Sequence, residues 1–265
     1  MKTAIIIFAA VFAFLLPIGA LIWWKKKSGE KLWPFIAGAI IFTAFAMGLE
    51  QILHYFCLMS DNPVSRVISG NVPLYALYGG LAAGIFEECG RFFGFKTLLR
   101  NHNEREVSIA YGIGHGGIEV ILILGMTYVV YSLFALGVPV VDAATEELMA
   151  QNLASIQPAV TLTACLERVI AMALHVGLSM IVFKAARGGG IKWLFIAIAI
   201  HAITDIPAVF CQQGQLPIWV IEVWCTVMAA LALKIGLTLY KGMAHQNEAA
   251  ETIIAEPVEV NDAAD

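Results

Sequence analysis

Histidine and acidic residues interrupt apolar sequence at four places in this chain of 265 residues. An ionisable side chain at the centre of a bilayer costs about 3 kcal/mol or more, so four such places need a common reason. The simplest reason is one polar active site that several helices build together. The residues concerned are Glu87 and Glu88 with Arg91, His115 with Glu119, His175, and His201 with Asp205.

Residues of these types could hydrolyse a peptide bond. A carboxylate or an imidazole can make a water molecule nucleophilic, and a histidine or an arginine can donate to the oxyanion that forms. This chemistry needs no cofactor. Alternatively, histidines and a glutamate could complete a tetrahedral zinc site, although the chain has no HExxH sequence. The ligands would then be Glu88, His115, His175 and His201.

The elements that carry these residues are predicted to cross a membrane. Hydrophobic residues make up 60% of the chain and charged residues 14%, and the apolar runs reach the roughly 20 residues that a crossing helix needs. The sequence therefore predicts an all-α, polytopic transmembrane bundle of about seven spans. The predicted spans are Thr3–Trp24, Leu32–Met59, Val72–Phe95, Val107–Leu136, Pro158–Phe183, Ile191–Phe210 and Leu216–Tyr240.

The chain is expected to form one membrane-embedded domain over residues 1–245. Residues 246–265 are acidic and poor in large apolar side chains, so we predict a disordered cytoplasmic tail there. Between the fourth and fifth spans, Asp142–Gln157 is predicted to be a surface helix.

Lysine and arginine predict the orientation of the spans. Positive residues cluster after the first, third, fifth and seventh spans, whereas the loops at the other end hold little beyond Lys2 and Arg66. The positive-inside rule therefore places the amino terminus outside and the carboxyl terminus in the cytoplasm, and we expect a bacterial cytoplasmic membrane.

Depth along the predicted helices supports a single site. At about 1.5 Å per residue, the first-named polar groups lie roughly 10–14 Å from the cytoplasmic ends of their spans: Glu87, Glu88, His115, His175 and His201. A second layer lies roughly 18–22 Å deep by the same rise and is predicted to support the first: Glu119, Asp205, Glu167 and Arg168. His115 and His201 each precede a carboxylate by four residues, which places the two side chains on one helical face. Such a carboxylate can hold an imidazole in one tautomer.

Structural interpretations remain open for several of these residues. Glu88 and Arg91 could form an internal ion pair with the arginine reaching towards the interface. Glu167 and Arg168 could form a buried polar clasp, and His175 could simply bind a backbone carbonyl. Cys89 between the glutamates is a weak candidate nucleophile, because the five cysteines show no spacing typical of a thiolate site.

The motifs resemble those of the YhfC family of intramembrane peptidases. The resemblance is carried by Glu87-Glu88 with Arg91, the Gly112–Glu119 stretch, Glu167-Arg168 followed by His175, and His201 four residues before Asp205. It covers most of the membrane region, from the third to the sixth span. It also places the chain beside the PrsW proteases, the CAAX prenyl endopeptidases and the anterior-pharynx-defective scaffold subunit of gamma-secretase.

This resemblance implies a role for each motif residue. Glu88 is similar to the catalytic base, Glu87 to its partner and Arg91 to the basic residue that closes the motif. His115 and His201 match the later histidines that help the base or donate to the oxyanion, and Asp205 matches the small polar residue after the last histidine. The Glu-Glu-x-x-Arg spacing is one residue shorter than in the prenyl endopeptidases, which turns the arginine by about 100° around the helix.

Together these features predict a glutamic-type intramembrane endopeptidase that acts near the cytoplasmic side, with a zinc-dependent metallopeptidase as the alternative. A non-catalytic scaffold or a proton-coupled transporter would use the same groups differently, and a haem site on two histidines is a weaker alternative. The expected partners are the lipid bilayer and a peptide or transmembrane-protein substrate, and no nucleic acid.

Overall fold

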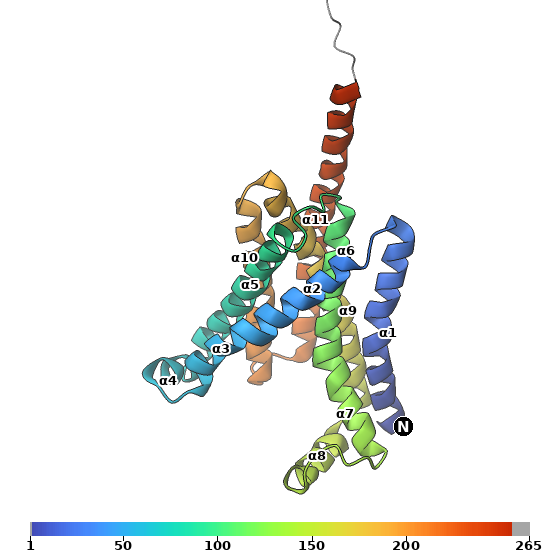
Figure 1. The fold of residues 1–265 in the computed structure, drawn as a ribbon. Helices are drawn as coiled ribbons and strands as arrows, with labels where there is room; N and C mark the ends of the chain where they lie inside the picture. The colour runs from blue at the N-terminus through green and yellow to red at the C-terminus, as the bar shows by residue number, and fades with distance from the viewer. Residues whose placement is uncertain (1, 256–265) are drawn as a thin grey trace, which may run out of the picture.

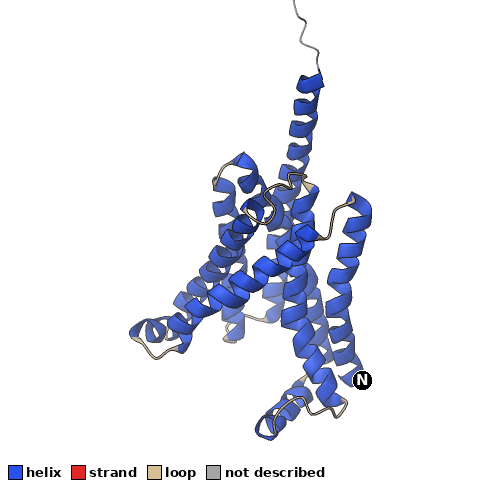
Figure 2. Cartoon of the chain, viewed as in Figure 1, coloured by secondary structure: helices blue, strands red, loops and turns tan. Residues whose placement is uncertain are grey.

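The computed structural model describes the backbone of residues 2–255 and the side chains up to 243 except that of Ala143, and in this part of the chain it contains only helices and turns (Figures 1 and 2). The α-helices are α1 (Lys2–Ser28), α2 (Trp33–Ala44), α3 (Glu50–His54), α4 (Pro63–Ser69), α5 (Val72–Lys96), α6 (Glu106–Val120), α7 (Met126–Ala135), α8 (Ala143–Ser155), α9 (Pro158–Lys184), α10 (Lys192–Gln212) and α11 (Ile218–Ala255). Wider π-helical turns continue α2 at Phe45–Leu49, α3 at Tyr55–Met59 and α6 at Ile121–Gly125.

Within the described residues, six helical segments are long and apolar enough to cross a membrane: Lys2–Ser28, Trp33–Met59, Glu106–Ala135, Pro158–Gly189, Lys192–Gln212 and Ile218–Met243. The predicted all-α, polytopic membrane bundle is therefore confirmed. The remaining predicted span corresponds to α5, whose 25 residues are long enough but include the charged motif. In Figure 1, α5 packs along α10 and returns from the tip near α4 to the end where α6 begins. A seventh crossing by α5 stays a prediction.

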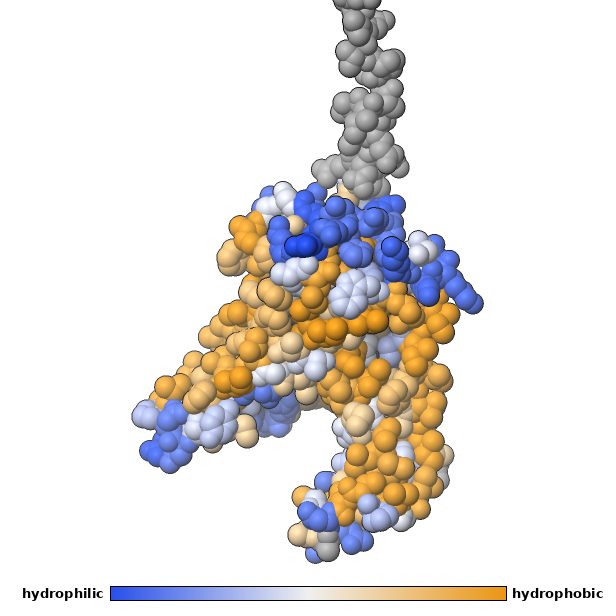
Figure 3. All heavy atoms as spheres, in the orientation of Figure 1, coloured by the Kyte–Doolittle hydropathy of each residue, from blue (hydrophilic) through white to orange (hydrophobic). Residues whose placement is uncertain are grey.

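The surface is zoned in the way that a membrane protein requires. Figure 3 shows hydrophilic residues at the end where α1 stops and α6 starts, and at the tips of two diverging arms, with an apolar band between them. One arm is α2 to α4 and the other is α6 to α8 (Figure 1). Helix α8 confirms the predicted surface helix, and Asp142 caps its start by accepting from the Thr145 amide. Residues 256–265 of the predicted tail lie outside the described residues, and α11 continues to Ala255.

Glycines let α6 approach two neighbouring helices closely. A Cβ on Gly114 would collide with the backbone of Phe35, and one on Gly38 would lie 2.8 Å from the His115 amide nitrogen. On the opposite face, a Cβ on Gly112 would lie 2.7 Å from the Cα of Val176. Helix α6 therefore sits between α2 and α9 at backbone contact distance, as small residues permit in membrane bundles. This close packing brings His115 to the centre of the bundle.

We predict that the two ends of the bundle lie on opposite sides of the membrane in the orientation given by the basic residues. A reporter inserted after Lys31 should respond as cytoplasmic, and one in the Asp142–Gln157 segment as external. Reporters placed at 61–71 and at 97–104 should differ, because α5 separates them. Equal responses at these last two positions would mean that α5 does not cross.

We also predict that Gly114→Ala lowers the thermal stability of the purified protein in detergent, because the added methyl group must separate α2 from α6. Gly19→Ala is the matched control, since a Cβ there meets nothing within 4 Å and alanine is the better helix former by about 1 kcal/mol. An unchanged melting temperature for Gly114→Ala would contradict the close crossing of the two helices.

Candidate active site

Arg91 is the most connected side chain of the predicted site. Its Nε donates to Glu88 Oε2 at 2.9 Å and its Nη2 to Glu88 Oε1 at 3.1 Å, and both side chains are fully buried. Its Nη1 donates to the backbone oxygen of His175 at 3.1 Å and also to Ser179 Oγ. The arginine therefore ties α5 to α9 inside the bundle and does not reach towards the interface.

His201 approaches the glutamate pair from α10. Its Nδ1 lies 2.7 Å from Glu88 Oε1, so Glu88 has partners at both oxygens. On the other side of the ring, Nε2 lies 3.4 Å from Asp205 Oδ2 and 3.9 Å from Glu87 Oε1. The predicted pairing of His201 with the carboxylate one turn away is therefore present.

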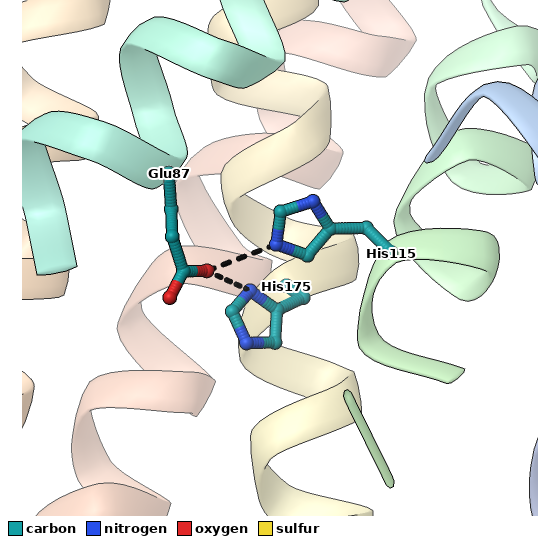
Figure 4. Close-up of side chains that lie close together, drawn as sticks. All are labelled: Glu87, His115 and His175. Atoms are coloured by element: carbon teal, nitrogen blue, oxygen red, sulfur yellow. Dashed lines mark hydrogen bonds and ion pairs between the residues drawn. The ribbon is translucent and has the colours of Figure 1, made fainter. Parts of the chain in front are cut away.

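Glu87 faces two histidines that come from other helices. Figure 4 shows one oxygen of its carboxylate facing the rings of both His115 and His175, which come from α6 and α9. Glu87 Oε2 is 2.9 Å from His115 Nε2 and 4.0 Å from His175 Nδ1. One possible ligand atom from each of these three residues lies within 4.8 Å of the others. The three side chains could thus hold a metal ion.

Glu119 contacts α9 and not the histidine on its own helix. Its Oε2 lies 2.5 Å from His175 Nε2, and its Oε1 accepts from Arg168 Nη1 at 2.7 Å. Arg168 also pairs with Glu167. A carboxylate this close to Nε2 favours the tautomer in which the opposite nitrogen, Nδ1, keeps its lone pair, and Nδ1 lies 3.1 Å from Arg91 Nη2.

A cavity of about 140 Å³ reaches this network. Its lining includes Glu87, His175 and His201 at the inner end and Ile221 on the first turn of α11. The volume has room for several water molecules, which occupy about 30 Å³ each in the liquid. The cavity lies on the side of the histidines away from the basic end, because its outer lining belongs to the carboxyl end of α10 and the amino end of α11.

Apolar side chains close the bundle on the other side of the network. Phe95, Leu99, Val107 and Phe183 have no exposed surface and pack together between the histidines and the basic end. We call these four residues the apolar plug. Arg187 lies beyond the plug and donates to the backbone oxygens of Phe95, Leu99 and His102, which satisfies the carbonyls at the end of α5.

All ten residues singled out in the sequence lie in this one network. Six were expected to be catalytic and four to be supporting, and the structure joins them through contacts among α5, α6, α9 and α10. Sequence reasoning missed Ser179, which lies four residues after His175 and accepts from Arg91 on the same face. Glu50 on α3 is a further buried acid, and its Oε1 lies 3.2 Å from His54 Nε2.

The fold and the site define a polytopic helical membrane protein with a buried centre of glutamate, histidine and arginine. The family model described as "YhfC intramembrane metalloprotease" matches residues 12–225, and the chain belongs to the YhfC family. It is 34% identical over 245 residues to a Bacillus subtilis (strain 168) protein described as "Uncharacterized membrane protein YhfC". That match covers 88% of this chain and 92% of the relative. No solved structure matches the chain.

We predict that Arg91→Met destabilises the protein by about 3–5 kcal/mol, because it leaves the Glu88 carboxylate buried without its cation. The change is measured by unfolding in detergent. The double variant with Glu88→Gln should recover part of the loss, since the unpaired charge is then removed.

Arg66→Met is the control for this prediction. Arg66 and Asp61 form an exposed ion pair at 2.7 Å, which should contribute only about 0–1 kcal/mol. Equal losses of stability in the two arginine variants would show that the buried ion pair contributes no more to stability than the exposed one.

Proposed function

We propose that this protein is a zinc-dependent intramembrane metallopeptidase whose metal ligands are Glu87, His115 and His175. The observation that carries the proposal is the buried group of one carboxylate and two imidazoles, with ligand atoms within 4.8 Å of one another. Compared with the ligand set expected from the sequence, Glu87 takes the place of Glu88, and His201 is assigned another role. The family description supports the same class of enzyme.

The chemistry of the three side chains fits zinc. Three protein ligands leave one of four tetrahedral positions open, as catalytic zinc sites require. Glu119 fixes the tautomer of His175 in which Nδ1 can bind the ion, and Arg168 in turn holds Glu119. His115 has no hydrogen-bond partner at Nδ1, so packing orients its ring, with the Phe42 ring at 5.0 Å edge-on.

Glu88 is less suited to the base role that the family resemblance implies. Its side chain has no exposed surface, and its oxygens accept from Arg91 and face His201. A general base must lie within hydrogen-bonding reach of the water that it deprotonates. Because both carboxylate oxygens of Glu88 already have partners, we assign Glu88 the role of holding Arg91 and His201 in place.

The remaining groups surround the place where a peptide bond would react. When bound, zinc would polarise the scissile carbonyl and lower the pKa of an attacking water. Arg91 Nη2 contacts the same two nitrogens, at 3.3 Å from His115 Nε2 and 3.1 Å from His175 Nδ1. These two contacts would be replaced when zinc is bound, and the freed Nη2 could then donate to an oxyanion beside the ion. His201 Nε2 faces the cavity beside Asp205, where it can pass a proton to the leaving amine.

The closed side of the bundle favours hydrolysis over proton-coupled transport. A transporter must connect its binding site to each side of the membrane in turn. Here the cavity reaches the network from one side, and the apolar plug lies on the other. A hydrolase needs only one route for water, which the cavity provides.

We predict about one zinc ion per chain in the purified protein and complete loss of cleavage with a chelator, restored by added zinc. Glu87→Gln and His115→Ala should abolish zinc binding, and Glu119→Gln should weaken it by roughly 10–100-fold because His175 loses its orienting partner. Metal analysis gives the stoichiometry. Cleavage is measured as new protein termini that appear in membranes carrying the wild type and do not appear in membranes carrying Glu87→Gln.

Glu147→Gln is the control, because Glu147 is an exposed acid on the surface helix α8. It should leave both the zinc content and the cleavage unchanged. Metal-free protein that cleaves in the presence of a chelator would support the glutamic mechanism instead. Metal-free protein that produces no new termini would support a scaffold.

A further inference from the structure

A second cavity, of about 470 Å³, lies near the basic end of the bundle and apart from the active site. Helices α1, α6, α9 and α11 line it, and α1 and α11 form its two opposite edges without packing on each other. Its deeper wall is apolar and includes Ile113, Met172, Val176 and Leu233. We call this cavity the α1/α11 groove.

The mouth of the groove has the residues of a membrane interface. Trp23, Lys27 and Tyr240 line it where α1 ends, and the Lys27 ammonium lies 5.0 Å from the Trp23 ring. Lys25 and Lys26 precede Lys27 on the same helical turn. The groove is therefore cationic and aromatic at one end and apolar along its depth. Its ligand must have the same polarity, with an anionic end and an apolar body.

We propose that the α1/α11 groove binds an anionic phospholipid, with one acyl chain against α6 and α9 and the phosphate beside Lys27. Basic pockets between transmembrane helices at a basic interface bind lipid head groups of this charge. Each lysine near such a surface contributes about a fivefold gain in affinity. This inference does not depend on the proposed peptidase activity.

Lys27 is the free cation at the mouth. Arg105 stacks on Tyr240 with its guanidinium carbon 4.4 Å from the ring centre, and Glu106 accepts from Arg105 Nε at 3.0 Å. Glu106 also accepts from the Tyr240 hydroxyl at 2.9 Å. The charge of Arg105 is thus matched, whereas Lys27 is exposed and forms no ion pair with the described carboxylates. A phosphate beside Lys27 would supply the missing anion.

The size of the groove favours an acyl chain over an α-helix as its ligand. An α-helix about 10 Å across with a 5.4 Å pitch fills roughly 400 Å³ per turn, so the groove would take only about one turn. A flexible hydrocarbon chain can follow the depth from Trp24 to Val169, both of which line it. A substrate helix is therefore the poorer fit, and it becomes an outcome of the test.

The test is native mass spectrometry of the purified protein after exchange into uncharged detergent with equal amounts of phosphatidylglycerol and phosphatidylcholine. We expect one retained phosphatidylglycerol per chain, preferred over phosphatidylcholine. Lys27→Glu should reduce this preference at least about fivefold. Ala20→Phe, which adds a ring to the groove wall, should abolish retention of both lipids.

Two variants serve as matched controls. Lys192→Glu reverses a charge at the basic end outside the groove, where the ammonium lies 5.5 Å from the Trp193 ring. Ala230→Phe adds a ring on an exposed face of α11. Both should retain phosphatidylglycerol like the wild type.

The proposal is overturned if Lys27→Glu keeps the full preference, if the wild type retains no phospholipid, or if a peptide occupies the groove. Lys27 is exposed, so we expect Lys27→Glu to fold normally. It therefore tests the proposal even if Ala20→Phe fails to fold. Zinc content and cleavage are read separately. Their loss would bear on the peptidase and leave the lipid result intact.

Discussion

A charge buried in a membrane bundle must find its opposite charge within the same bundle, because lipid supplies none. Arg91 and Glu88 meet this requirement for each other, and the rest of the polar network is arranged around them. Arg91 fixes the backbone of α9 beside His175, and Glu88 fixes His201 on α10. The groups proposed for catalysis therefore also hold the helices together. A change at this pair would alter the fold and the chemistry at the same time.

The glycines of α6 allow the distances between the polar side chains of this network to be short. Glycine contributes no side chain, so α2 and α9 approach the backbone of α6 directly and His115 reaches the carboxylate of a third helix. The cost is a loss of helix propensity of about 1 kcal/mol per glycine in a soluble helix. In this bundle the loss is offset by backbone packing and by polar contacts that a wider spacing would break.

Much of this arrangement could be predicted from the sequence, and the rest depends on how the helices rotate. The spans and the common depth of the polar residues follow from hydropathy and from the rise of a helix. The partner of Glu119 does not, because the i, i+4 rule pointed to His115 and the structure pairs it with His175. Glu87 and Glu88 are about 100° apart on their helix, so only the packing of α5 decides which one meets the histidines.

The apolar plug has a consequence for the electrical resistance of the membrane. A bundle that admits water to histidines and carboxylates risks becoming a proton leak, which would dissipate the gradient that the membrane maintains. Phe95, Leu99, Val107 and Phe183 carry no polar side-chain group that could join a hydrogen-bonded chain of water. An ion entering it would meet the same cost of about 3 kcal/mol or more that burial in hydrocarbon imposes. The protein can thus admit water to the polar network inside the bilayer while the membrane around it remains insulating.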